Sequence, residues 1–130
     1  MTKTCRVIAI VDDDPRVLKA LARLASTRCF SARTFPSGPQ FLASLLKELP
    51  DCVILDLQMP EMTGLEIQQN LRRAGIEIPV IIITAHDETG MRERCKAAGA
   101  VAYLSKPVRA TSLFAAIDAA TGNANGSAIC

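Results

Sequence analysis

The sequence predicts a single α/β domain in which a parallel five-stranded sheet is covered by helices on both faces. Three observations support this fold class. Short apolar runs alternate with segments of helical periodicity along nearly the whole chain, a pattern typical of parallel sheets. Three of the runs are rich in Val, Ile and Leu without alternation, as in strands buried on both faces: Arg6–Val11, Cys52–Leu57 and Pro79–Thr84. The 130 residues suffice for one domain with a real core.

The first part of the chain predicts two strands and two helices. The strand Arg6–Val11 leads into Asp14 and Pro15, where Asp can cap a helix and Pro suits the first helical position, so a helix is expected over about 15–26. The alternating segment Cys29–Phe35 predicts an edge strand, which Pro36-Ser37-Gly38 ends. Helical spacing then predicts a second helix, closed by Pro50, on the apolar positions Phe41, Leu42, Leu45, Leu46 and Leu49.

The rest of the chain repeats this alternation. After the strand Cys52–Leu57 comes a loop with Pro60 and Gly64. The following elements are a helix at about Leu65–Arg73, the strand Pro79–Thr84, a helix at Met91–Ala98, a short strand at Val101–Leu104 and a helix at about Thr111–Ala120. Residues 121–130 are small and polar and predict a flexible tail. The predicted domain is therefore 1–120.

The strand order expected for this pattern is the flavodoxin-like order 2-1-3-4-5. Strands one, three and four are the most apolar and so belong inside the sheet. Right-handed crossovers leave few other topologies. In this (βα)5 three-layer sandwich the order reverses between strands one and three, and ligands bind at such a switch point beyond the carboxyl ends of the strands.

Composition excludes several classes of function. The formal net charge is +2 and the charges are scattered, which does not favour nucleic-acid or membrane binding. The five cysteines are widely spaced without a CxxC pair, so reduced thiols in a cytoplasmic protein are expected rather than a zinc or redox site. There is no signal peptide and no apolar run long enough to span a membrane.

Polar residues gather at the carboxyl ends of the predicted strands. Asp12 and Asp13 follow the first strand, Asp56 lies near the end of the third, Thr84 ends the fourth, and Lys106 follows the fifth. In a parallel sheet these ends share one edge. Three neighbouring carboxylates repel one another, so the site should hold a proton or a cation. Mg²⁺ is the cation expected, because it prefers oxygen ligands and leaves positions for water and phosphate.

This constellation is suited to phosphoryl chemistry. An Asp can attack phosphorus and form an aspartyl phosphate, while a cation neutralises the phosphoryl oxygens. Lys106 would add a point charge and Thr84 a hydroxyl donor. Each residue taken alone has an ordinary explanation, such as an acidic helix start or a turn lysine. Their joint placement on four strand ends is what points to a site.

Four segments resemble the receiver domain of two-component response regulators. They are VDDDP at Val11–Pro15, ILDLQMPEMTG at Ile54–Gly64, IIITA at Ile81–Ala85 and SKP at Ser105–Pro107. The similarity extends over about Val7 to Ala120 in the family's order and spacing, and the LDLxMPxMxG block is highly specific. The sequence is most similar to receivers of the FixJ type.

The resemblance implies a role for each site residue. Asp56 would accept a phosphoryl group, and Asp12 and Asp13 would bind Mg²⁺, with Asp13 the more direct ligand. Asp56 and the backbone carbonyl of Gln58 would complete the protein ligands. Lys106 would contact the phosphoryl group, and Thr84 would move to bond it. The protein would catalyse only its own phosphorylation and dephosphorylation.

The resemblance also implies a switch and a lifetime control. Tyr103 matches the aromatic switch position, and drawing Thr84 inward would open space for it to turn in. Without that role, Tyr103 would be a half-buried residue with its hydroxyl at the surface. Gln58 and His86 hold the positions that set how long the phosphate survives, although a solvated loop residue is the simpler explanation of His86.

The partners implied are a sensor histidine kinase or phosphotransfer protein and an output partner. The output partner would read the surface formed by the fourth helix, fifth strand and fifth helix, and phosphorylation could produce a homodimer. We expect no direct contact with nucleic acid or membrane. Both a single-domain regulator and a receiver cut from a longer protein agree with the sequence, and the first is preferred.

Three other functions fit the sequence less well. A haloacid-dehalogenase-type phosphatase would use Asp12 and Asp14 as its DxD pair, but the chain is short for one with a cap domain. A flavodoxin-like electron carrier would need a Ser/Thr/Gly-rich phosphate loop where this chain has acids. A degenerate receiver acting only in binding is disfavoured because the acceptor, acidic pair, Thr and Lys are all present.

Overall fold

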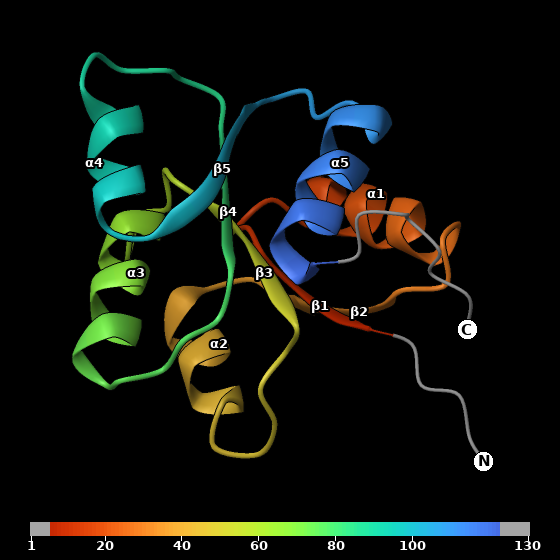
Figure 1. Ribbon diagram of the computed structural model, residues 1–130, viewed down its shortest axis with the longest axis horizontal. Helices are drawn as coiled ribbons and strands as arrows, with labels where there is room; N and C mark the ends of the chain where they lie inside the picture. Colours follow the sequence, from red (N-terminus) through yellow and green to blue (C-terminus); the bar gives the residue numbers. More distant parts are fainter. Residues whose placement is uncertain (1–5, 123–130) are drawn as a thin grey trace.

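The computed structural model describes residues 6–122 and shows one parallel five-stranded sheet between two layers of helices (Figure 1). The strand order is β2-β1-β3-β4-β5, which confirms the flavodoxin-like prediction. The strands are β1 (Val7–Val11), β2 (Ser31–Phe35), β3 (Cys52–Asp56), β4 (Val80–Thr84) and β5 (Ala100–Ser105). The helices are α1 (Pro15–Ser26), α2 (Gly38–Ser44), α3 (Gly64–Arg73), α4 (Met91–Ala97) and α5 (Ala110–Thr121).

The sheet separates two apolar clusters, one under each helix layer. In Figure 1, α2, α3 and α4 cover one face, and α1 and α5 cover the other. Alternate residues of each central strand point to opposite clusters: Val53 and Leu55 to the first, Cys52 and Ile54 to the second. Every residue of β3 and β4 is buried, which explains why their sequences lack polar alternation.

Helix boundaries follow local capping chemistry. The Asp14 side chain accepts a hydrogen bond from the Arg16 backbone N–H, and Pro15 occupies the first helical position, as predicted. The sequence Thr63-Gly64-Leu65-Glu66 forms a capping box that starts α3, with Thr63 and Glu66 bonding each other's backbone N–H groups. None of the helices within residues 6–122 is long and apolar enough to cross a bilayer.

The second helix differs from its prediction. It ends at Ser44, and turns carry the chain onward, so Leu46 is 91% exposed and Leu49 is 53% exposed. The chain must turn back because Asp51 exchanges two hydrogen bonds with Val7, from its backbone N–H and to its carboxylate, which fixes the start of β3 beside β1. The apolar spacing beyond Leu45 was therefore not a helical core face.

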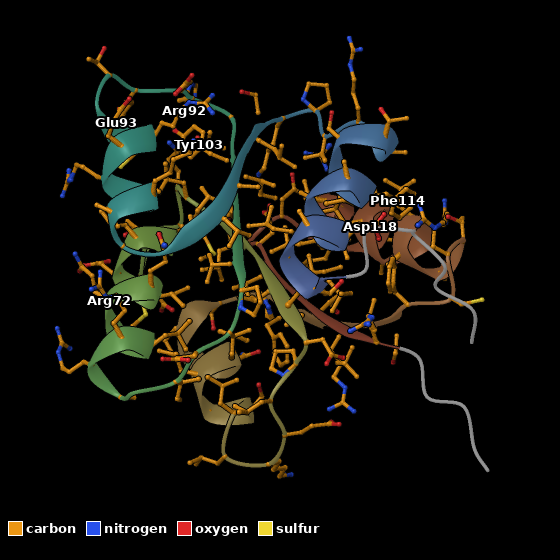
Figure 2. All side chains as sticks on the ribbon, in the orientation of Figure 1. Arg72, Arg92, Glu93, Tyr103, Phe114 and Asp118 are labelled. Carbon is orange, nitrogen blue, oxygen red and sulfur yellow. The ribbon has the colours of Figure 1, made fainter. Side chains whose placement is uncertain are left out.

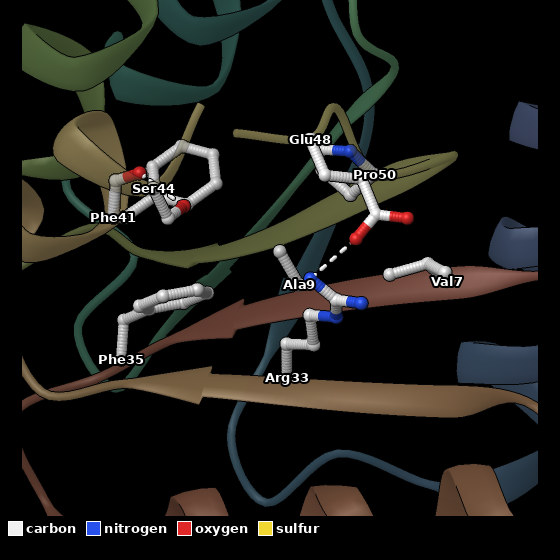
Figure 3. A pocket seen from close by; sticks show the side chains of 8 residues that line it. All are labelled: Val7, Ala9, Arg33, Phe35, Phe41, Ser44, Glu48 and Pro50. Carbon is white, nitrogen blue, oxygen red and sulfur yellow. Dashed lines mark hydrogen bonds and ion pairs between the residues drawn. The ribbon is translucent and has the colours of Figure 1, made fainter. Parts of the chain in front are cut away.

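An ion pair crosses this turn, which Leu46 and Leu49 do not bury. The Glu48 carboxylate pairs with the Arg33 guanidinium of β2 at 2.5 Å, across a cavity of about 10 Å³ (Figure 3). Phe35 and Phe41 meet edge to face at its floor. The second strand also begins two residues later than predicted, because Cys29 adopts a left-handed conformation (φ 64°) in the turn after α1. Thr121 belongs to α5, and the rest of the predicted tail, 123–130, lies outside the described residues.

Candidate functional site

Three carboxylates meet at the carboxyl edge of β1 and β3, as the sequence predicted. Asp12 and Asp13 directly follow β1, and Asp56 is the last residue of β3. One carboxylate oxygen of each lies within 4.8 Å of the others. Asp12 and Asp56 are buried, at 0% and 2% exposed, whereas Asp13 is exposed. The cluster is thus a cup with two buried acids at its base and one at its rim.

Lys106 brings a positive charge into this cup. Its ammonium lies 2.9 Å from Asp12 Oδ2 and 3.4 Å from Asp56 Oδ1. The backbone N–H of Lys106 donates to the Thr84 carbonyl at 2.8 Å, which places the side chain just beyond the end of β4. The ammonium therefore bridges the two buried carboxylates and partly offsets their repulsion.

The charges in the cup shift the ionisation of the Asp56 carboxyl. Burial, followed by the negative charge of Asp12, raises the pKa of Asp56 to about 7, although Lys106 acts in the opposite direction. The pKa of Lys106 is raised in turn. Burial alone would lower it, but the contact with Asp12 and the charge of Asp56 outweigh burial. Near neutral pH, the metal-free site is therefore poised between binding a proton and binding a cation.

The donor set suits a divalent cation such as Mg²⁺. Oδ2 of Asp12 is fully buried and is approached by the Lys106 ammonium, but among the described residues it has no well-directed hydrogen bond. A metal ion bound here would share this oxygen with the Lys106 ammonium. Three carboxylates with one exposed member leave coordination positions open for water and phosphate, as Mg²⁺ requires.

Asp14 does not belong to the cluster. Its carboxylate caps α1 and pairs with Arg16 at 3.3 Å, and the hydrogen bond from Arg16 lowers the pKa of Asp14. The DxD arrangement expected of the phosphatase alternative, with Asp12 and Asp14 acting together, is therefore not formed.

Thr84, Gln58 and His86 form a closed ring of hydrogen bonds beside the cup. The Thr84 hydroxyl lies 2.8 Å from Gln58 Oε1, Gln58 Nε2 donates to the His86 carbonyl at 3.1 Å, and the His86 N–H donates to the Thr84 hydroxyl at 3.1 Å. The hydroxyl is also 2.8 Å from the His86 carbonyl, but its single proton can serve only one acceptor. His86 takes part in this ring only through its backbone N–H and carbonyl, and the residue is exposed.

Gly64 permits the loop after β3 to fold back against the end of that strand. A Cβ atom at this position would lie 2.8 Å from the Asp56 carbonyl oxygen and 3.2 Å from the Leu57 Cα. Because backbone atoms cannot give way as a flexible side chain can, a glycine is needed here. The sequence predicts only a loop at Gly64, whereas the fold brings this residue close to the backbone of Asp56 and Leu57.

Tyr103 lies deeper than the half-buried position expected. Only 5% of it is exposed, and its hydroxyl is buried without a hydrogen-bond partner among the described residues. Burial, with the carboxylate of Asp87 nearby, raises its pKa. The ring is thus inside while the Thr84 hydroxyl is bonded beside Gln58 and His86. The predicted switch has the Tyr103 ring turning inward when Thr84 moves, whereas in this structure the ring is already inside.

Arg92 and Asp87, which the sequence did not single out, lie beside Tyr103. The Arg92 guanidinium lies over the Tyr103 ring, and Asp87 pairs with Arg92. No local motif identifies them, because their partners come from different elements.

An apolar groove of about 540 Å³ runs from Lys106 along α1. Its apolar walls are Val17, Ala20, Leu21 and Leu24 of α1 with Pro107 and Val108 of the following loop. The groove opens beside the charged cup, so a protein that reached Asp56 from this side would find an apolar surface.

Comparison with known proteins gives one consistent result. The family model described as the response regulator receiver domain matches residues 8–118. The chain is 40% identical over 120 residues to the response regulator protein TodT of Pseudomonas putida, covering 92% of this chain and 53% of that protein. It is 35% identical over 118 residues to nodulation protein W of Bradyrhizobium diazoefficiens, covering 91% and 52%.

Solved structures agree with this match. The crystal structure of FixJ-N is similar, with a TM-score of 0.84 and 34% identity, covering 94% of this chain and 96% of that one. A response regulator receiver protein from Burkholderia phymatum has a TM-score of 0.80 and 44% identity, covering 90% and 95%. The chain spans about half the length of the curated relatives.

Proposed function

The chain belongs to the response regulator receiver family of two-component systems, and on that premise we propose that Asp56 is its phosphoryl acceptor. The observation that carries the proposal is the buried Asp56 carboxyl, held at a strand end beside Lys106 and two further acids. A carboxylate in this setting can be used as a nucleophile, because the surrounding groups supply the charge that a phosphoryl group requires.

The reaction requires few protein groups. An Asp56 carboxylate oxygen attacks phosphorus, a new O–P bond forms, and the donor's bond to phosphorus breaks, with the electron pair leaving on the donor atom. Lys106 lies within reach of Asp56 and can neutralise charge on the product. The Thr84 hydroxyl can donate to a phosphoryl oxygen only after it gives up its bond in the ring with Gln58 and His86.

Mg²⁺ is the proposed cofactor of this step. The carboxylates of Asp12, Asp13 and Asp56 would hold it, with the backbone carbonyl of Gln58 as a further ligand. When bound, the ion would neutralise charge on the phosphoryl oxygens. The three carboxylate oxygens that gather within 4.8 Å of one another support this assignment.

The proposed donor is a sensor histidine kinase or phosphotransfer protein, acting in the cytoplasm. The groove between α1 and the loop after β5 supports a protein donor, because it borders Lys106 and offers apolar contacts. We propose no catalysis beyond the protein's own phosphorylation and dephosphorylation. The output partner, or a second copy in a phosphorylated homodimer, would bind across α4, β5 and α5. An NMR shift map that left this face unchanged on phosphorylation would contradict that assignment.

The decisive experiment is intact-mass measurement after incubation with acetyl phosphate and Mg²⁺. The parent protein should gain about 80 Da, one PO₃H group, and Asp56→Asn should gain nothing. Asp51→Asn, a substitution of the same kind outside the cup, should behave as the parent. A sensor kinase in place of acetyl phosphate tests the protein donor. An adduct of equal yield on Asp56→Asn would refute the assignment.

Gln58 should prolong the life of the phosphoryl group. Its amide is held by Thr84 and His86 at the mouth of the site, so it is better placed to exclude water than to orient it. Gln58→Ala should shorten the half-life roughly threefold to tenfold, in line with the loss of about one hydrogen bond. The decay of the mass adduct after donor removal measures this.

His86→Ala is the matched control for Gln58→Ala. It removes a side chain from the same loop but leaves the backbone atoms that bond Gln58 and Thr84. The half-life should change much less. A longer half-life in Gln58→Ala would show that Gln58 positions the attacking water instead.

A further inference from the structure

Arg92 and Tyr103 join α4 to β5 through a cation–π contact. The guanidinium carbon of Arg92 lies 4.7 Å from the centre of the Tyr103 ring. Figure 2 shows the two side chains next to each other between the start of α4 and β5. Arg92 is on the exposed side of the buried ring, with 44% of its side chain exposed. Its guanidinium therefore covers an aromatic ring that would otherwise border solvent.

Asp87 restrains Arg92 from the loop before α4. Its carboxylate lies 3.9 Å from the Arg92 guanidinium. Asp87 directly follows His86, whose backbone is bonded to Thr84 and Gln58. A continuous series of contacts thus runs from the edge of the acidic cup, through this loop, to the face of the Tyr103 ring.

Little else fixes the ring in place through a directed bond. The Tyr103 hydroxyl is buried without a well-directed hydrogen bond among the described residues, and the Asp87 carboxylate is the acceptor that approaches it. The helix that carries Arg92 spans only seven residues, and its N-cap, Gly90, provides no side-chain hydrogen bond. The buried position of the ring depends on apolar packing and on the group that covers it.

We propose that Arg92 is a positioning residue that holds Tyr103 inward before any phosphorylation, and that Asp87 keeps Arg92 over the ring. The inward position of the Tyr103 ring would then depend on the loop between β4 and α4, as well as on any space opened by movement of Thr84. The link to phosphorylation rests on the proposed function. The holding of the ring by Arg92 does not.

Tyr103 can be observed directly, because it is the only tyrosine and the sequence contains no tryptophan. Acrylamide quenching of its fluorescence reports its exposure, and phenolate absorbance reports its ionisation. Arg92→Ala should increase the quenching constant roughly twofold to fivefold, as expected for loss of one cation–π contact at the surface. Arg94→Ala removes the same charge from a different side of α4, two residues further on, and should leave quenching unchanged.

The direction of the pKa change separates a positioning role from a charge effect. The Arg92 charge lowers the pKa of Tyr103, whereas burial, Asp87 and Cys95 raise it. If the ring stayed buried in Arg92→Ala, its pKa would rise and quenching would not change, which would overturn the proposal. If the ring becomes exposed, burial is lost and the pKa falls toward the ordinary tyrosine value.

Two further variants test the nature of the contact. Arg92→Lys keeps a cation and should restore most of the protection from quenching, and a result equal to Arg92→Ala would overturn the role of the cation. Asp87→Asn should also increase quenching. Its pKa change is not diagnostic, because loss of the Asp87 charge lowers the Tyr103 pKa even in a buried ring. Unchanged quenching in Asp87→Asn would remove Asp87 from the proposal.

The link to Asp56 is tested with acetyl phosphate and Mg²⁺. The parent ring is already inside, so phosphorylation should change its quenching little. In Arg92→Ala, phosphorylation should return the ring inward and reduce quenching clearly. Equal small changes in both proteins would refute the coupling but leave the Arg92 contact intact. Absence of a mass adduct on either protein would instead count against the proposed function.

Discussion

Asp56→Asn should stabilise the metal-free protein at about pH 8, raising the free energy of unfolding by about 2–4 kcal/mol. The reason is the crowding of buried charge: the pKa of Asp56 is raised to about 7 by burial and by Asp12. An acid with a raised folded-state pKa favours the folded state while it is protonated. That contribution is lost as the pH rises through the folded-state pKa, and Asn, which is never charged, avoids the loss.

Urea unfolding with EDTA at two pH values measures this effect. At about pH 5.5 the parent carboxyl is protonated in the folded state but still ionised in the unfolded chain, so the gain from Asn should shrink to about half. Mg²⁺ should stabilise the parent more than the variant, because the ion needs the carboxylate. Glu61→Gln, which removes one exposed acid elsewhere, should have little effect at either pH. A gain independent of pH would show that charge repulsion at Asp56 is not its cause.

Lys106→Met should have the opposite effect on stability to Asp56→Asn. It should lower the free energy of unfolding at about pH 8 by about 2–4 kcal/mol. The ammonium lies within ion-pair distance of both Asp12 and Asp56, and both acids are buried. Removing it leaves two neighbouring negative charges without compensation. Protonation of Asp56 relieves the strain, so the loss should diminish at about pH 5.5.

The same unfolding measurements test Lys106, with Lys96→Met as control. Lys96 is an exposed lysine of α4, and its substitution should be nearly neutral. In an Asp56→Asn background, the cost of Lys106→Met should fall but not vanish, because the contact with Asp12 at 2.9 Å remains. An unchanged cost in that background would mean that Lys106 and Asp56 do not interact energetically.

The fold was largely predictable because its signals are local or strongly periodic. The unbroken apolar runs at β1, β3 and β4 correspond to the inner strands, and the Asp14-Pro15 pair starts α1 as expected. The second helix was the main error. Leu46 and Leu49 continue the apolar pattern of Phe41, but tertiary hydrogen bonds between Asp51 and Val7 end the helix earlier and leave both leucines exposed.

The site was predictable to the extent that it lies at strand ends. Parallel pairing brings every carboxyl end to one edge, so the meeting of Asp12, Asp13 and Asp56 follows from the strand order. The repulsion among them predicted a bound proton or cation, but which acid has the raised pKa could not be predicted this way. The raised pKa of Asp56 depends on its burial and on a separation from Asp12 that only packed coordinates provide.

By itself, the amino-acid sequence determined which segments form the central strands, which acids follow them and which family the motifs resemble. The tertiary structure alone decided that Tyr103 lies inside under Arg92, that Gln58 closes a hydrogen-bond ring with Thr84 and His86, and that Gly64 touches the Asp56 backbone. The physical reason is the range of each interaction. An apolar strand pattern and a helix cap can be recognised from neighbouring residues, whereas these contacts join side chains and backbone that only the packed fold brings together.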